Sequence, residues 1–246
     1  MSSVALLGIV QTVCGEIGLP IPSTVVGSTT QQVRQLVAFA NVTGDSLRDE
    51  TAWPALRKTA KITTVNGTAG YTVSLASGGN TYTCSRIIQE TGWDATNSWY
   101  FVGSVNDAEW MQWQYGIMST PIRRIWRTTS DSTIEVFPVP TTNGDTLALA
   151  FVTDLWAQSS TGVPQGALSA DTDVHLFNDR LFLLGLKWRF LEAKGLPFVA
   201  PKAEYDRIIS VRKAAARPQR TLSLDRRATN RHFIDYRNVP DTGFGA

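Results

Sequence analysis

Apolar residues recur at helical spacing near the beginning of the chain. Over residues 4–18 they form one stripe, and Pro20 directly afterwards should end that helix. A second stripe follows Thr29 and Gln32, which have the spacing of a capping box, and Trp53-Pro54 should end or kink this second helix. The two stripes consist of Leu6, Val10, Val13 and Ile17, and of Val33, Leu36, Val37, Ala40 and Leu47.

From about Lys61 the period of the apolar residues changes from helical to alternating. Asn66-Gly67 is a hairpin signal between strands at 61–65 and 71–75, and Gly78-Gly79-Asn80 is another before a strand at 81–89. Further strands rich in β-branched and aromatic residues are predicted at 98–102, 122–128, 133–137 and 146–152, with a short helix at 106–115. This series of short strands and turns predicts a small barrel or sandwich.

The helical period returns after the loop at 159–166. Asp171 and Asp173 are plausible caps or dipole partners for a long helix that Gly195 should end, and Pro201 suits the start of a last helix through about Ala216. The long helix has one apolar seam and a second apolar strip beside it. The seam consists of Phe177, Leu181, Leu184, Trp188 and Leu191, and the strip contains Leu183, Leu186, Phe190 and Ala193.

A helix that is apolar over so much of its girth must be covered on more than one side. Either it is the central helix of its own bundle, or a neighbouring subunit covers the second strip. We take Leu183, Leu186 and Phe190 as the candidates for such an intersubunit contact.

These patterns predict an α+β fold in which both ends of the chain form one helical bundle. Residues 1–60 and 167–216 would make the bundle, and residues 61–166 would be the inserted β domain. Residues 217–246 would form an extended C-terminal arm.

The arm has a composition unlike that of the rest of the chain. From Arg212 to the end, eight basic side chains stand against three acidic ones, and because the whole chain has a formal net charge of +2, the preceding body is mildly acidic. Such a segment cannot build its own core, so we expect it to order on meeting a partner. Its candidate contact residues are Arg217, Arg220, Leu222, Leu224, Arg226, Arg227, Arg231, His232, Phe233, Ile234, Tyr236 and Arg237.

The search for chemistry adds little to this picture. The eight tryptophans favour an oligomer, although ordinary core positions would also account for them. Cys14 and Cys84 are expected to be buried free thiols, and no apolar window approaches the ~20 residues needed to cross a membrane. His175, with Asp179 four residues later, fits an exposed helix start better than a metal site. No catalytic residue, metal or cofactor is therefore predicted.

Two segments of the chain resemble head-to-tail adaptor proteins of short-tailed bacteriophages. One is the string LFLLGLKWRFLEAKGLP at 181–197, followed by AEYDRIISVRKAAARP, and the other is the Trp53-Pro54-Ala55-Leu56-Arg57 element. The order of helices, β insertion, helices and arm extends the resemblance over nearly the whole chain.

The resemblance implies a ring, typically a dodecamer, at the head-tail interface of the virion. The helical bodies would pack side by side, the arm would bind the portal protein, and the tail tube or nozzle protein would bind the other face. Genomic DNA would pass through the lumen without sequence-specific binding.

Two other functions stay open from the residues alone. A nucleic-acid-binding protein could use the same basic arm on phosphate groups. A second alternative is a tail-associated cell-wall hydrolase, in which two of the residues Glu16, Glu50, Glu90 and Glu109 would act as the catalytic pair of carboxylates.

Overall fold

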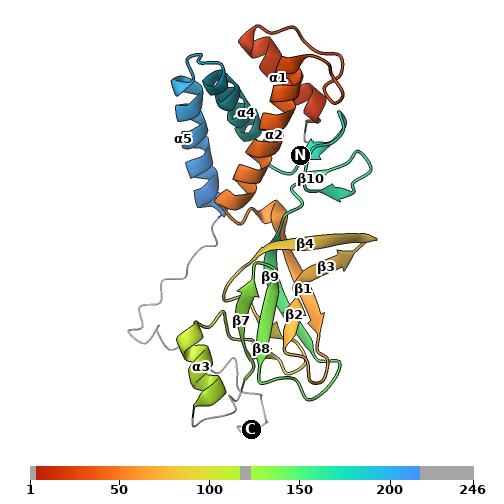
Figure 1. Cartoon of the computed structure of the whole chain (residues 1–246), viewed down its shortest axis with the longest axis vertical. Helices are drawn as coiled ribbons and strands as arrows, with labels where there is room; N and C mark the ends of the chain where they lie inside the picture. Colours follow the sequence, from red (N-terminus) through yellow and green to blue (C-terminus); the bar gives the residue numbers. More distant parts are fainter. Residues whose placement is uncertain (1–3, 117–122, 217–246) are drawn as a thin grey trace, which may run out of the picture. The chain divides into compact units, whose positions relative to one another are not determined.

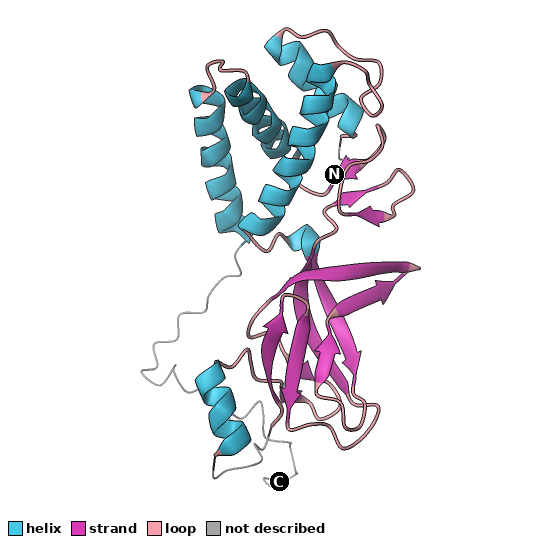
Figure 2. Ribbon diagram, viewed as in Figure 1, coloured by secondary structure: helices cyan, strands magenta, loops and turns pink. Residues whose placement is uncertain are grey.

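The computed structural model describes residues 4–116 and 123–216, so the predicted arm at 217–246 lies outside the described residues. The described chain forms two compact units, and their helices and strands confirm the predicted α+β class (Figures 1 and 2). The first unit contains residues 4–57, 76–82 and 153–216, and the second contains 58–75, 83–116 and 123–152.

Helices from the two ends of the chain pack together in the first unit. Its helices are α1 (Leu6–Ile17), α2 (Gln31–Glu50), α4 (Asp179–Ala193) and α5 (Val199–Ala216). Helix α4 contacts the other three, and α1 also contacts α2. Figure 1 shows α2 and α4 between α1 and α5.

Residues suited to capping stand at both ends of helix α4. Asn178 is the N-cap, and its side-chain oxygen accepts a hydrogen bond from the Leu181 amide at 3.2 Å. Gly195, just beyond the helix, has a φ of 67°, the left-handed conformation that glycine adopts without strain. Between these ends the residues buried within the protomer lie on most sides of the helix: Leu181, Phe182, Leu184, Gly185, Leu186, Phe190 and Leu191.

This burial decides between the two alternatives for the second apolar strip. Leu186 is 0% exposed and Phe190 is 1% exposed within a single protomer. The prediction that these two side chains lie in an intersubunit contact is therefore wrong, because helices of their own chain already cover them. Leu183 is partly buried, and its contact with a neighbour stays a prediction.

Two glycines allow the helices of the first unit to approach closely. A Cβ at Gly185 would lie 2.6 Å from a methyl carbon of Thr43 in α2, and a Cβ at Gly44 would lie 2.2 Å from the indole of Trp156. Since real Cβ atoms do not approach other atoms so closely, α2 must present a bare backbone to Trp156 and α4 a bare backbone to α2.

The second unit contains most of the strands together with α3 (Asp107–Tyr115), and the 3-10 turn η1 (Pro54–Leu56) precedes the first strand. These strands are β1 (Arg57–Thr63), β2 (Gly70–Thr72), β3 (Ser74–Ser77), β4 (Asn80–Ile87), β5 (Trp93–Asp94), β6 (Trp99–Tyr100), β7 (Ile125–Ser130), β8 (Thr133–Phe137) and β9 (Thr146–Thr153), with the end of β3 and the start of β4 falling in residues 76–82 of the first unit. The first unit adds β10 (Ala157–Gln158), β11 (Pro164–Gln165) and β12 (Val174–His175).

These strands make three open sheets. One has the order β3-β4-β9-β5-β6 with β1 also paired to β9, another is β2-β8-β7, and the third is β11-β10-β12. Among the described strands no sheet closes on itself, so of the two predicted alternatives, a small barrel or a sandwich, the barrel is not formed.

The hairpin predicted at Asn66-Gly67 is also wrong, because β1 pairs with β9 whereas β2 pairs with β8. The turn itself forms, and Gly67 has a φ of 74°. However, the Asn66 amide donates to the side chain of Asn143 at 2.7 Å and the Gly67 amide donates to the Pro140 carbonyl at 2.9 Å. These bonds to a distant loop separate the two strands into different sheets.

The burial of Leu186 gives a direct test of the core. We expect Leu186→Ala to lower the free energy of unfolding by about 2–5 kcal/mol, because it removes a fully buried side chain and leaves a cavity. Urea unfolding followed by circular dichroism measures this difference. Val211→Ala on α5, where Val211 is 60% exposed, is the matched control and should cost less than about 0.5 kcal/mol. Equal effects of the two substitutions would contradict the central position of α4.

Candidate interaction surfaces

The last turn of α5 is fastened to the end of α2. Arg57 donates a hydrogen bond from Nε to the Ala52 carbonyl at 2.8 Å and another from its terminal nitrogen to the Ala216 carbonyl. Lys213 forms an ion pair with Glu50. We call these residues, Glu50, Ala52, Arg57, Lys213 and Ala216, the arm root, because the sequence of the predicted arm follows Ala216 directly.

Trp53 makes further contacts near the end of α2. Its indole N–H donates to the Leu47 carbonyl near the end of α2, and its ring meets Phe177 edge to face at 6.1 Å between centroids. The Trp53–Arg57 element that carried the sequence resemblance thus joins α2 to α5. Sequence reasoning did not assign Arg57 this role, since no local signal connects it to a carbonyl 159 positions away.

His175 lies inside the first unit, so the prediction that it is an exposed helix start is wrong. Its side chain is 1% exposed and stacks on Phe182 with 4.2 Å between ring centroids. Asp179 is the nearest acidic partner, with Oδ1 3.4 Å from Nε2 of His175, and the same oxygen accepts a hydrogen bond from the Val4 amide. Burial lowers the pKa of His175 to about 4 despite the carboxylate of Asp179.

The aspartates that precede α4 organise loops and do not cap the helix, which corrects the sequence prediction. Asp171 accepts a hydrogen bond from the Val26 amide at 2.6 Å. Asp173 is buried and accepts one from the Ser169 amide at 2.7 Å. Asn178 is the residue that caps α4.

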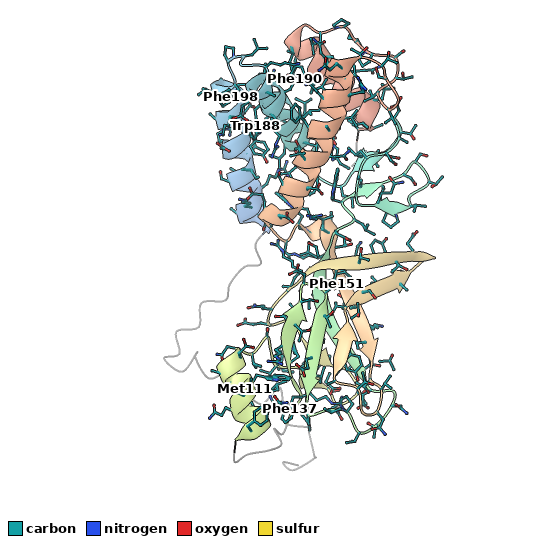
Figure 3. All side chains as sticks on the ribbon, in the orientation of Figure 1. Met111, Phe137, Phe151, Trp188, Phe190 and Phe198 are labelled. Carbon is teal, nitrogen blue, oxygen red and sulfur yellow. The ribbon has the colours of Figure 1, made fainter. Side chains whose placement is uncertain are left out.

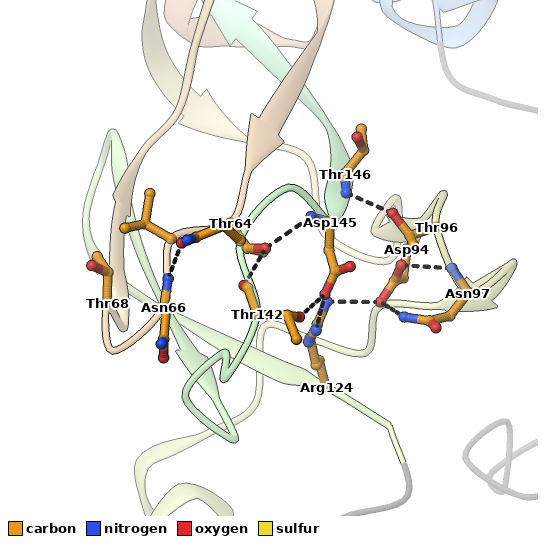
Figure 4. A network of polar contacts seen from close by, with 12 residues as sticks. Thr64, Asn66, Thr68, Asp94, Thr96, Asn97, Arg124, Thr142, Asp145 and Thr146 are labelled. Atoms are coloured by element: carbon orange, nitrogen blue, oxygen red, sulfur yellow. Dashed lines mark hydrogen bonds and ion pairs between the residues drawn. The ribbon is translucent and has the colours of Figure 1, made fainter.

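The second unit contains a network of polar contacts around Arg124 (Figure 4). The guanidinium donates to Asp94 at 3.2 Å and also to Asp145, which accepts a further hydrogen bond from the Thr142 hydroxyl. Asp94 is buried and also accepts a hydrogen bond from the Asn97 amide at 3.0 Å. One arginine therefore neutralises two carboxylates and holds their loops together, an arrangement suited to rigidity rather than to acid–base chemistry.

Helix α3 presents apolar side chains on its outer face. Trp110 is buried against Phe137 and under the guanidinium of Arg127, which lies 4.6 Å from its ring centroid. Met111, which is labelled in Figure 3, is exposed, and so is Tyr115 one turn further along the helix. Sequence analysis predicted this helix but not the exposure of its far side.

Metal and membrane chemistry find no support in the part of the chain that the structure describes. Residues 4–116 and 123–216 contain no group of three or more metal-ligating side chains. Within the same ranges, no helix combines the length and hydropathy that crossing a membrane requires.

The candidate portal-binding residues from Arg217 to Arg237 lie beyond the described residues.

The depressed pKa of His175 predicts a pH dependence of stability. The unfolded chain takes up a proton near pH 6.5 and the folded chain only near pH 4, so stability is complete above about pH 6.5 and falls as the pH drops to 4. The loss should be on the order of 3 kcal/mol. Urea unfolding at several pH values should show this slope in the wild type and in His232→Ala, but not in His175→Leu. Parallel pH profiles for wild type and His175→Leu would contradict the assignment.

The arm root predicts a local effect of Arg57. Arg57→Ala removes the donor to the Ala216 carbonyl, so the last turn of α5 should fray and trypsin should cleave after Arg212 and Lys213 several-fold faster. Mass spectrometry of timed digests measures these cleavages. Arg48→Ala, which removes an ion pair to Asp49 on α2, is the matched control. Unchanged cleavage in Arg57→Ala would show that the arm root does not hold α5.

Comparison with known proteins agrees with the resemblance noted in the sequence. No curated protein matches the chain. A protein-family model described as SU10 adaptor protein matches residues 6–236, which includes all the helices and strands described above and most of the predicted arm. The chain therefore belongs to the SU10 adaptor protein family.

Proposed function

We propose that the protein forms a ring between the capsid portal and the tail, at the head-tail interface of the virion, and that DNA passes through the lumen of this ring. The family match over residues 6–236 supports a structural adaptor of a bacteriophage. In this proposal the C-terminal arm binds the portal protein, and the tail tube or nozzle protein binds the opposite face.

The arm root is the observation that carries the proposal. The hydrogen bond from Arg57 to Ala216 and the ion pair between Glu50 and Lys213 fix the end of α5 immediately before the basic segment. A segment that leaves a rigid body from a fixed point loses less freedom on binding than one that leaves a frayed helix. A fixed exit therefore suits an arm that must reach a defined place on a partner.

The hydrolase alternative loses two of its candidate carboxylates. Glu16 forms an ion pair with Lys187, and Glu50 is part of the arm root. These contacts give both glutamates a structural role on the surface of the helical unit. The nucleic-acid alternative depends on the same arm as the proposed function, so an experiment on the arm must separate the two.

Removing the arm should abolish attachment to the portal. We expect a chain that ends at Ala216 to remain folded, because the core of the first unit lies within residues 4–216, but to lose portal binding measured by co-sedimentation. In the protein that keeps its arm, trypsin should cleave after Arg220 when the protein is free and should be blocked there when it is bound to portal. Full protection of the free protein would contradict the proposal.

A double substitution in the arm separates portal binding from nucleic-acid binding. Phe233→Ala with Tyr236→Ala keeps every arginine, so it should weaken portal binding at least tenfold while any affinity for DNA at low salt stays unchanged. Phosphate contacts would make DNA affinity fall steeply as salt concentration rises. If salt-dependent DNA binding is strong and portal binding is absent in the wild type, the nucleic-acid function replaces the adaptor ring.

A further inference from the structure

Helix α3 carries large apolar side chains on two opposite faces. On the inner face, Trp110 is 2% exposed and packs against Phe137, beside β7 and β8 (Figure 1). The outer face follows the spacing i, i+3, i+4, i+7, which places side chains in one stripe along a helix. The residues of this α3 stripe are all exposed, and they are Ala108, Met111, Gln112 and Tyr115.

The α3 stripe is held in a fixed position by the start of the helix. Asn106 caps α3 by accepting a hydrogen bond from the Glu109 amide at 2.7 Å, and Asp107 forms an ion pair with Arg127 at 3.3 Å. A helix face that meets water usually carries charged side chains, whereas the α3 stripe carries none. The stripe is therefore suited to contact with another apolar segment.

The charged residues beside the stripe leave this part of the surface acidic. Arg127 pairs with Asp107 of α3 and with Glu135 of β8. Glu109, one turn before Trp113, adds a third carboxylate to the same helix, and α3 contains no basic residue. Because three carboxylates stand against one guanidinium, a segment that combines apolar side chains with positive charge would fit this surface.

The predicted arm has both of these properties. Between residues 217 and 246, six arginines stand against three aspartates. Phe233 and Tyr236 lie three positions apart, with arginines flanking the pair. Their rings suit Met111 and Tyr115, because a thioether and an aromatic ring both make favourable contacts with a second aromatic ring.

The arm is also long enough to reach α3 of its own chain. It begins at Ala216, which accepts a hydrogen bond from Arg57, the first residue of β1, and Lys58 already belongs to the second unit. When extended, the segment 217–233 spans about 55 Å. A compact unit of roughly 80 residues has a radius of gyration of about 12 Å, so this span is greater than the diameter of the second unit.

We propose that Phe233 and Tyr236 of the arm lie on the α3 stripe of the same chain until the arm binds the portal. The flanking arginines then lie beside Asp107 and Glu109. In this state the arm covers an apolar face of the second unit, and two of its own aromatic side chains are covered as well. The competition with the portal rests on the proposed function, whereas the contact itself does not depend on it.

The covalent connection makes such a small contact sufficient. A flexible tether gives an effective concentration on the order of 1 mM, so a dissociation constant of about 0.1 mM keeps the arm docked roughly nine-tenths of the time. Residues 217–230 remain the tether, which leaves Arg220 accessible to trypsin in the free protein.

Cross-linking within one chain tests the contact. Gln112→Cys, on the stripe, is combined with Asn238→Cys, two positions beyond Tyr236, and the free protein is treated at low concentration with a short bis-maleimide linker. We expect most molecules to gain a link within the chain, which mass spectrometry of a digest identifies. The wild type accounts for any reaction of Cys14 and Cys84, which are buried.

A second cysteine pair is the matched control for this experiment. Val65 is 51% exposed and belongs to the second unit but not to α3, so Val65→Cys with Asn238→Cys should give at least fivefold less link. Equal linkage from both pairs would overturn the inference, because the arm would then have no preference for the stripe. A link only between chains, seen when the Gln112→Cys and Asn238→Cys single variants are mixed, would also overturn it.

Loss of the stripe should make the arm more available to the portal. Met111→Ser with Tyr115→Ser should raise portal affinity about tenfold, since only about one-tenth of intact chains present a free arm. Both side chains are exposed, so the circular dichroism should stay native. Val42→Ser on α2, where Val42 is 50% exposed like Met111, should bind portal as the wild type does. An affinity that stays the same or falls in the double variant would contradict docking on the stripe.

Portal added to the cross-linking reaction separates this inference from the proposed function. If both are correct, portal should reduce the link between positions 112 and 238 at least tenfold. A strong link that portal does not change, together with no portal binding by the wild type, would refute the proposed function while the docked arm stands. Portal binding by a protein that never forms the link would refute the docked arm alone.

Discussion

The burial of α4 is the constraint on which the helical unit depends. This helix has few polar positions and needs cover on most sides, and the cover comes from α1 and α2 before it in the chain and α5 after it. Gly185 makes the contact with α2 possible, because any side chain there would collide with Thr43. The first and last thirds of the chain are consequently held to one another, and the strands of the second unit occupy the sequence between them.

The helices could be predicted from sequence because their signals are local. Apolar spacing and Gly195 predict α4 and its end, although Asn178 rather than Asp171 or Asp173 caps its start, and the same reasoning predicts α1, α2, α3 and α5. Strand pairing could not be predicted in the same way. The Asn66-Gly67 turn forms as predicted. However, β1 and β2 pair with β9 and β8 instead of with each other, and the turn is held by residues about 75 positions later in the chain.

The interaction surfaces show the same division between local and distant information. Basic and aromatic residues mark the arm in the sequence itself, whereas the arm root requires the meeting of Arg57 with Ala216. The apolar residues of α3 are visible in the sequence, yet nothing local distinguishes its exposed face from its buried one. The predicted exposure of His175 is wrong for a similar reason, since the side chain is buried by stacking on Phe182.

The arm root also has an electrostatic consequence. Helices α2 and α5 both bring their C-terminal ends to this place, and each end carries a partial negative charge of roughly half an elementary unit from its aligned peptide dipoles. The cations of Arg57 and Lys213 offset part of this field. A basic sequence that continues from Ala216 therefore starts in an electrostatic potential that favours positive charge.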